Sequence, residues 1–119
     1  QVHRARLHDG TPVAVKVQKQ SIGHQIGWDM ACFRLLCFAF ERIFDLPLSW
    51  TCDTITRHVL DELDFIGEAH RSERCATDAL HNGFDDIYVP RVFWPVTSAR
   101  VLTAEWCDGV RLTDRATLD

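Results

Sequence analysis

The sequence predicts an α+β fold in which one antiparallel sheet carries its helices on one side. Three observations carry this prediction. Apolar and charged residues alternate near the start of the chain, a helical period replaces the alternation between residues 21 and 81, and β-branched residues return after that. The predicted order is two strands, two long helices, two strands and the start of a further helix.

The first two strands form a predicted β-hairpin. Residues 1–7 alternate, Asp9-Gly10 is a strong signal for a tight turn, and the segment "PVAVKVQ" at 12–18 is rich in β-branched residues. Alternate residues of a strand point to opposite faces. We expect the face that holds Val13, Val15 and Val17 to form the core. The opposite face, with Ala14, Lys16 and Gln18, is expected to lie over whatever is beneath the sheet.

The first long helix is predicted over residues 21–44, because its apolar residues recur every three or four positions. Ser21 is a candidate N-cap and Pro47 a stop signal. The apolar stripe is typical of a helix that packs on protein, and acidic neighbours argue against a membrane-surface helix. Its members are Ile22, Ile26, Met30, Phe33, Cys37, Phe40 and Phe44.

The second long helix is predicted over residues 51–81, with Asn82-Gly83 as its end signal. Two strands, 87–94 and 100–106, follow with a short turn between them. A last helix is predicted from residue 112, with Thr113 or Asp114 as its cap. The helical spacing of the second helix is kept by Cys52, Ile55, Val59, Leu63 and Ile66.

Composition excludes several functions. The chain has 119 residues, enough for one domain, and its net charge of −4 argues against binding to nucleic acid. Its five cysteines show no paired spacing, so we expect reduced and mostly buried thiols. We expect no metal site, because His70, Cys75 and His81 do not share one helix face.

Lys16 poses the main chemical question, since it is a cation inside a strand of valines and alanine. A half-buried ammonium needs an acidic partner. The segment "DELDFIGEAHRSER" at 61–74 offers several acids, although such a charged run can also be a solvated face. We expect Glu68 to be the partner, because glutamate has the longer reach and small Ala69 follows it. Asp64 lies four residues earlier and is expected near the same helix face.

Three blocks of this sequence resemble the UbiB/AarF-domain atypical kinases, and most of all the mitochondrial AarF-domain group. They are "QVHRARLHDGTPVAVKVQ", "ELDFIGEAHRSER" and "VPRVFWPVTSARVLTAEWCDGVRLTD", and they cover almost the whole chain. The resemblance implies that residues 1–119 are part of a protein-kinase-like domain. They would be its N-lobe through the hinge, and the C-lobe would be absent.

The same resemblance implies roles for single residues. Lys16 would bind the α- and β-phosphates of ATP, and Glu68 would be the helix glutamate that holds it. Glu62 and Asp64 match the family's ExD motif, which closes over the substrate side of the pocket. The adenine would lie among Val2 and Ala14 as a roof, Ala104 as the gatekeeper, and Glu105, Trp106 and Cys107 as the hinge.

Departures from the family pattern limit what this chain is expected to do alone. Gly67 or His70 stands where the family usually has Asn, and no KxGQ segment is present. The Ala-rich loop is reduced to "QV", and no catalytic-loop Asp or DFG-type Asp follows Asp119. We therefore expect the Mg²⁺ ligands to lie in the missing C-lobe, and the chain by itself to be inactive.

The resemblance implies an ATP-binding lobe of a kinase or ATPase linked to ubiquinone or lipid homeostasis. Its partners would be a nucleotide and, through the longer protein, a lipid or quinone and a membrane surface. The location would be the mitochondrial inner membrane, although this chain shows no targeting segment. The alternative is a non-catalytic pseudokinase or lipid-handling adaptor. An ordinary protein kinase is disfavoured by the ELD block and the long first helix.

Overall fold

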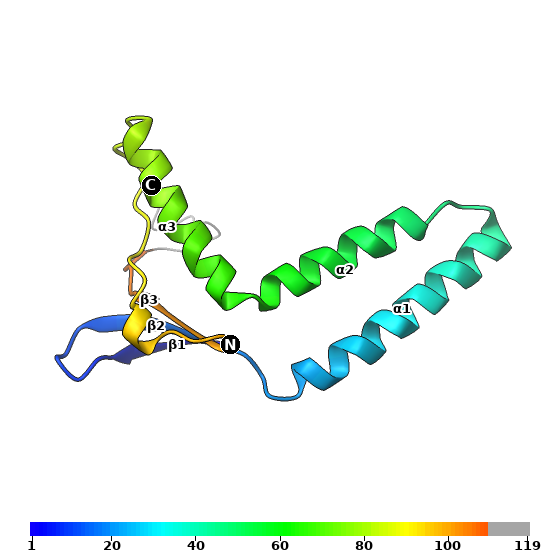
Figure 1. The fold of residues 1–119 in the computed structure, drawn as a ribbon, viewed down its shortest axis with the longest axis horizontal. Coiled ribbons are helices and arrows are strands. Elements are labelled where there is room, and N and C mark those ends of the chain that lie inside the picture. Colours follow the sequence, from blue (N-terminus) through cyan, green and yellow to red (C-terminus); the bar gives the residue numbers. More distant parts are fainter. Residues whose placement is uncertain (110–119) are drawn as a thin grey trace, which may run out of the picture.

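The computed structural model describes residues 1–109, apart from the side chain of His24. Over those residues the fold is α+β, with three helices between the second and third strands of a three-stranded antiparallel sheet. Two of the helices, α1 and α2, project from the sheet as an arm (Figure 1). This arm explains why the radius of gyration is 19.1 Å, where a compact chain of this length would have about 13.5 Å.

The predicted hairpin is confirmed. Strands β1 (Val2–Arg6) and β2 (Pro12–Val17) pair in antiparallel register. In the turn, Gly10 has a φ of 88°, a conformation that side chains other than glycine rarely adopt. The carboxylate of Asp9 accepts a hydrogen bond of 2.9 Å from the backbone N–H of Thr11. The turn chemistry written in the sequence therefore fixes the register that places Lys16 opposite Val2.

The third strand, β3 (Val101–Glu105), pairs with β2 and completes the order β1-β2-β3. The prediction of a further strand at 87–94 is wrong. That segment is extended but makes only an isolated bridge, between Val92 and Ala104, with hydrogen bonds of 2.9 Å on either side. Pro90 has no N–H to give to a ladder, and Pro95 lies in a short 3₁₀ helix, η1 (Trp94–Val96).

Helix α1 (Ile22–Phe44) lies where the spacing predicts it. Ser21 occupies the N-cap position, but its side chain makes no capping hydrogen bond. The helix ends at Asp45, which adopts the left-handed conformation with a φ of 54° and donates its N–H to the carbonyl of Glu41. The stop therefore precedes Pro47 and uses a left-handed C-cap.

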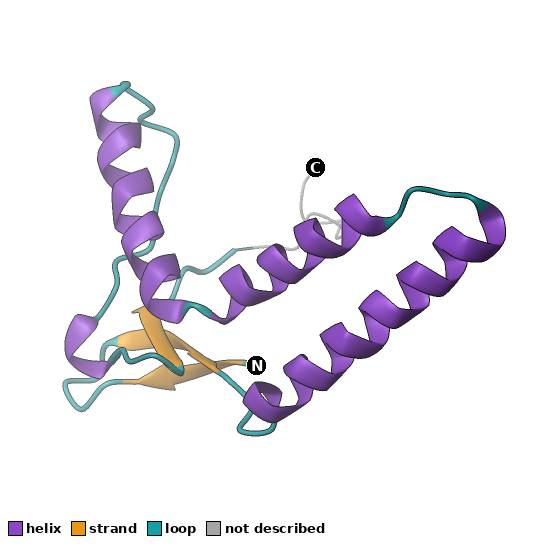
Figure 2. Cartoon of the chain, turned by 45° about the vertical axis from the view of Figure 1, so that its right-hand side comes forward, coloured by secondary structure: helices purple, strands orange, loops and turns teal. Residues whose placement is uncertain are grey.

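The prediction of one helix over 51–81 is wrong, because the structure has two. Helix α2 (Ser49–Leu63) ends at Leu63, and α3 (Phe65–His81) begins two residues later in a new direction (Figure 2). Asp64 separates them with a ψ of 80°, outside the helical region. Its side chain caps α3 instead of continuing α2, since aspartate competes well for backbone donors. Gly83, with a φ of 68°, follows the end of α3 as expected.

The arm buries few apolar side chains between α1 and α2 and exposes many on its outer surface. Met30, Phe33 and Cys37 of the predicted stripe on α1 are half-buried or buried, whereas many large apolar side chains of the arm are exposed, Phe40 and Phe44 of the same stripe among them. The expectation that the cysteines are mostly buried is wrong, because only Cys37 and Cys52 are buried. The exposed members include Trp28, Leu35, Leu36, Phe38, Ile43 and Trp50, and the exposed thiols are Cys32, Cys75 and Cys107.

The core lies on a different face of the sheet from the one expected. Its cluster joins α3 to the sheet and consists of Phe65, Ala69, Val92 and Leu102, with Trp94 beside it. Leu102 is the register partner of Lys16, and directly paired residues share a face. Helix α3 therefore packs on the Lys16 face. On the valine face Val13 is buried, but Val15 and Val17 are only half-buried. The helix predicted from residue 112 lies outside the described residues.

Candidate functional site

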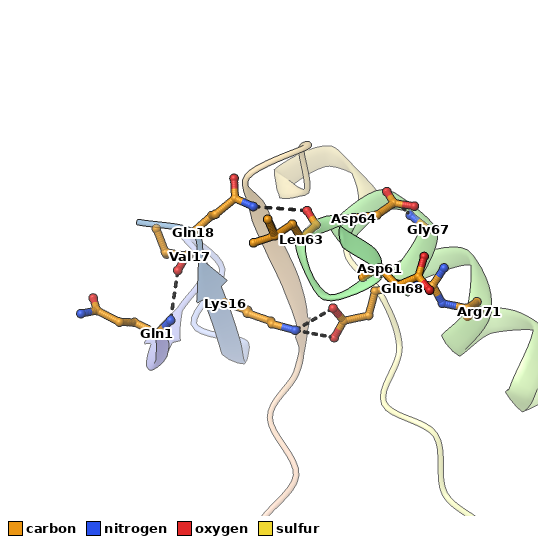
Figure 3. Close-up of polar contacts among 10 residues, drawn as sticks. All are labelled: Gln1, Lys16, Val17, Gln18, Asp61, Leu63, Asp64, Gly67, Glu68 and Arg71. Atoms are coloured by element: carbon orange, nitrogen blue, oxygen red, sulfur yellow. Dashed lines mark hydrogen bonds and ion pairs between the residues drawn. The ribbon is translucent and has the colours of Figure 1, made fainter. Parts of the chain in front are cut away.

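The centre of the candidate site is an ion pair between β2 and α3. The ammonium of Lys16 lies 2.6 and 2.9 Å from the two carboxylate oxygens of Glu68 (Figure 3). Their side chains are 28% and 36% exposed, so the pair is sheltered but open to a ligand. The ammonium also lies 4.8 Å from the centre of the Phe65 ring, a cation–π contact. The predicted partner of Lys16 is thus confirmed, and its role stays a prediction.

The start of α3 is what brings Glu68 to Lys16. Phe65 and Ala69, one turn apart, are buried against the sheet, and Ala69 has no exposed surface. The small Ala69 lets the helix approach closely, so Glu68 beside it can reach β2. Glu68 lies in the first turn of α3, where the helix dipole favours an acidic side chain.

Asp64 has a different use from its neighbour Glu68. Its carboxylate accepts a hydrogen bond of 2.9 Å from the N–H of Gly67 and so caps α3. The expectation that Asp64 and Glu68 share one face of a helix is wrong, because Asp64 lies between two helices. Glu62, by contrast, is exposed and lines two hollows beside the ion pair, of about 350 and 300 Å³. Of the two ExD acids, Glu62 lies at the edge of the site, and Asp64 caps the helix that carries Glu68.

Gly67 leaves the space that this cap occupies. A Cβ at this position would overlap the carboxylate of Asp64 and lie within 2.9 Å of the Arg71 guanidinium. Both neighbours are side chains, so a larger residue would displace the cap. The departure from the family pattern at Gly67 is therefore compatible with a well-formed start of α3.

The predicted nucleotide residues share one face of the sheet. Val2 is the register partner of Lys16, and Ala14 is the register partner of Ala104. Directly paired residues point the same way, so all four side chains lie on the face that carries the ion pair. Val2 is 63% exposed, so this face is open at the β1 end.

The predicted hinge begins at Glu105, the last residue of β3, and two of its three backbone N–H groups are already bonded within the fold. The N–H of Glu105 donates to the carbonyl of Arg91 at 2.9 Å, and that of Trp106 donates to the carbonyl of Pro12 at 3.3 Å. Within the described residues, Cys107 shows no such backbone bond. The neighbouring Tyr88 hydroxyl and the N–H of Arg91 lower the pKa of the Glu105 carboxyl.

Three further residues of the site have no role in the sequence-based prediction. Phe65 lies under the Lys16 ammonium, and Arg4 stacks at 4.8 Å on the Trp106 ring at the hinge. Gln18 donates a hydrogen bond of 3.3 Å to the carbonyl of Leu63. The two-residue period of β2, which places Gln18 on the Lys16 face, is the signal that could have found it.

Comparison with known proteins matches the whole chain to one family. The family model for the ABC1 atypical kinase-like domain matches residues 1–119. The chain is 36% identical to AarF domain-containing protein kinase 1 of Mus musculus over 120 residues, which is 100% of this chain and 22% of that protein. It is 36% identical to the ABC1 family protein C10F6.14c of Schizosaccharomyces pombe, with 99% and 23% covered.

A solved structure is also similar. It is Rv3197 of Mycobacterium tuberculosis in complex with erythromycin, with a TM-score of 0.64 and 25% identity over 92% of this chain and 27% of that one. The chain thus spans about a quarter or less of each protein described here. In the described part, no helix is long and apolar enough to cross a membrane.

Proposed function

Because the chain belongs to the ABC1 atypical kinase-like domain family, we propose that it is the ATP-binding lobe of an atypical kinase or ATPase. The observation that carries the proposal is the ion pair between Lys16 and Glu68. It is sheltered by α3 and stands on the face of the sheet that also carries Ala14 and Ala104.

The ion pair prepares Lys16 for phosphate. An ammonium has three donors, and two of its contacts go to the carboxylate oxygens of Glu68 at 2.6 and 2.9 Å. The remaining capacity is available to a phosphate oxygen, for which lysine acts as a point charge. Glu68 and the ring of Phe65 restrict the lysine chain, so less conformational entropy is lost when the ligand binds.

The adenine would lie against the open face next to the ion pair. Ala14 and Ala104 are small and leave room for a flat ring, and Val2 would cover it from β1. The carbonyl of Glu105 and the N–H of Cys107 are the hinge groups that we propose for the adenine edge. Trp106 would border the mouth of the pocket, where Arg4 stacks on its ring.

Phosphoryl transfer would need groups from outside this chain. Among the described residues, no cluster of three or more His, Cys, Asp or Glu side chains could hold a metal ion. We propose that Mg²⁺ is held by a C-lobe in the longer protein and that this chain alone does not catalyse the reaction. The longer protein would act in ubiquinone or lipid homeostasis at the mitochondrial inner membrane, with a lipid or quinone and a membrane surface as further partners.

A second candidate is a non-catalytic pseudokinase or lipid-handling adaptor. The observation in its favour is the exposed apolar surface of α1, where Trp28, Leu35 and Ile43 are 77%, 68% and 71% exposed. Surfaces of this kind serve to bind partners. The two candidates differ in whether nucleotide binding depends on Lys16.

The test is the affinity for Mg-ATP, measured by calorimetry in a protein that joins this chain to a C-lobe. Lys16→Met should weaken binding about 10- to 100-fold, as expected when a hydrogen bond to a charged group is lost. Lys19→Met is the matched control, because the chain has two lysines and Lys19 is exposed just beyond β2. Equal affinities for the two variants would refute the proposed role of Lys16.

A further inference from the structure

We propose that Gln18 is a positioning residue, which braces the joint between α2 and α3 and so couples the arm to the Lys16–Glu68 ion pair. The joint is defined here as residues 61–67. The brace follows from contacts between described residues and does not depend on nucleotide binding. Its effect on the nucleotide rests on the function proposed above.

The brace itself is one hydrogen bond at the end of α2. The side-chain amide of Gln18 donates to the carbonyl of Leu63 at 3.3 Å, and both residues are half-buried (Figure 3). Leu63 is the last residue of α2, where carbonyl groups have no partner inside the helix. Gln18 is itself fixed to the sheet, because its backbone N–H donates to the carbonyl of Arg100 at 3.0 Å.

Lys16 and Gln18 provide two side-chain contacts to the helices. Lys16 lies in β2 and Gln18 directly follows that strand, about 7 Å further along an extended chain. Lys16 holds Glu68 and Gln18 holds Leu63, so the two side chains contact the chain on either side of the break at Asp64. Together with the packing of Phe65 and Ala69, these contacts fix the end of α2 and the start of α3 relative to the sheet.

Hydrogen bonds of its own also hold the joint together. The cap from Asp64 to Gly67 fixes the first turn of α3, and the Arg71 guanidinium donates to the carbonyl of Asp61 at 3.4 Å. A displacement of Leu63 is thus passed to the first turn of α3, which carries Glu68. The joint transmits motion because both of its helix ends are held by side chains.

The arm leaves the sheet and returns to it at the same place. The chain enters α1 directly after Gln18, through residues 19–21, and comes back at Leu63, whose carbonyl Gln18 holds. Figure 1 shows the two helices of the arm side by side, projecting away from the sheet. A force that a bound partner applies to the arm therefore reaches the sheet through Gln18, as well as through α3 and the linker at 19–21. The structure assigns Gln18 the position from which such a force would be passed to Glu68.

The brace can be tested on this chain by pulsed electron paramagnetic resonance. Spin labels on the exposed Cys32 of α1 and Cys75 of α3, with Cys107→Ser, report the spread of distances between arm and α3. Gln18→Met keeps the length of the side chain but removes the donor, and Gln18→Lys restores a donor. Gln20→Met, in the exposed linker before α1, is the matched control.

We expect the distance distribution to broaden for Gln18→Met only, and to return to its original width for Gln18→Lys. A distribution that Gln18→Met leaves unchanged, or that Gln20→Met broadens equally, would overturn the brace. Circular dichroism of each variant shows whether helix content is kept. Broadening that is not reversed by Gln18→Lys would also overturn the proposal, because the donor would then be irrelevant.

The coupling is tested by Mg-ATP affinity in the protein that includes a C-lobe. Gln18→Met should weaken binding about 3- to 10-fold, in the range of mutations that act through a coupled element, and Gln20→Met should not. Suppose that Lys16→Met weakens Mg-ATP binding as expected. If Gln18→Met then broadens the distance distribution but leaves the Mg-ATP affinity unchanged, the coupling is refuted. If Lys16→Met instead has no effect, the proposed function fails and the brace, measured on the chain alone, stands.

Discussion

The sheet with α3 and the arm are built on different principles, although both are rich in apolar residues. The sheet and α3 share a buried cluster, in which Phe65 is 4% and Ala69 0% exposed. The arm exposes residues as large as Trp28, at 77%, and is held together by a few contacts between α1 and α2. Its polar contacts include the ion pair of Arg34 with Asp53 at 3.3 Å.

This difference in the burial of apolar side chains indicates which part of the chain is rigid by its own packing. Local stability follows the density of buried apolar contacts, so the sheet and α3 should open last and the arm first. The ion pair lies in this packed part. Among residues 1–109, the arm is attached to it through the joint and the linker before α1. The arm can therefore move without separating Lys16 from Glu68, as long as the contacts of the joint are kept.

The largest loss of stability is expected from a cavity under α3, in the packed part of the molecule. Phe65→Ala should lower the free energy of unfolding by about 3–5 kcal/mol, as for other buried phenylalanines. Phe38→Ala on the arm, where the side chain is 65% exposed, is the matched control and should change it by less than about 0.5 kcal/mol. Urea titration followed by circular dichroism measures both. Similar losses for the two variants would contradict the division into a packed part and an open arm.

Much of the packed part could be predicted from the sequence because its signals are local. The Asp9-Gly10 turn sets the hairpin register, and the two-residue period puts Lys16 on a defined face. The identity of its partner also follows from local chemistry, since Glu68 is long and small Ala69 comes next. These signals act within a few residues, so no tertiary contact can easily override them.

The joint could not be predicted from the sequence, because tertiary contacts decide it. The apolar period runs on through Leu63 and Ile66, so nothing in it marks the break at Asp64. Asp64 can serve as a helix interior residue or as a cap, and the bond from Gln18 to Leu63 supports the second use. The wrong strand at 87–94 has a different cause, because Pro90 within that segment is a local signal against a ladder, and the segment makes a single bridge in the structure.

The smallest expected effect concerns the turn of the arm. Glu41 in α1 accepts hydrogen bonds from the N–H groups of Leu48 and Ser49, at 2.9 and 3.2 Å, and from the Ser49 hydroxyl. The Ser49 hydroxyl and the two backbone N–H groups lower the pKa of Glu41 from its ordinary value of 4.5. A lowered pKa means that the stabilisation is complete above pH 4.5 and is lost as the pH falls through the lowered value.

We therefore expect hydrogen exchange at residues 45–50 to accelerate relative to β2 when the pH falls below 4.5, after correction for intrinsic rates. Glu41→Gln should show faster exchange there already at neutral pH and little further acid dependence. Arg42→Gln, an exposed neighbour, is the control. Acid sensitivity of this turn that is unchanged in Glu41→Gln would show that another group controls it.

The central claim, that Lys16 is the phosphate-binding lysine, is tested most directly by an acyl-phosphate derivative of ATP. Such a reagent transfers its acyl group to an amine that lies beside the bound phosphates, and peptide mass spectrometry identifies the acylated lysine. The chain provides its own control, because Lys16 and Lys19 are its two lysines. In the protein that includes a C-lobe, we expect acylation of Lys16 that excess Mg-ATP suppresses, with only slow, ATP-insensitive acylation of exposed Lys19. Acylation of Lys16 that Mg-ATP does not suppress, or ATP-sensitive acylation of Lys19 in its place, would show that Lys16 does not bind the phosphates.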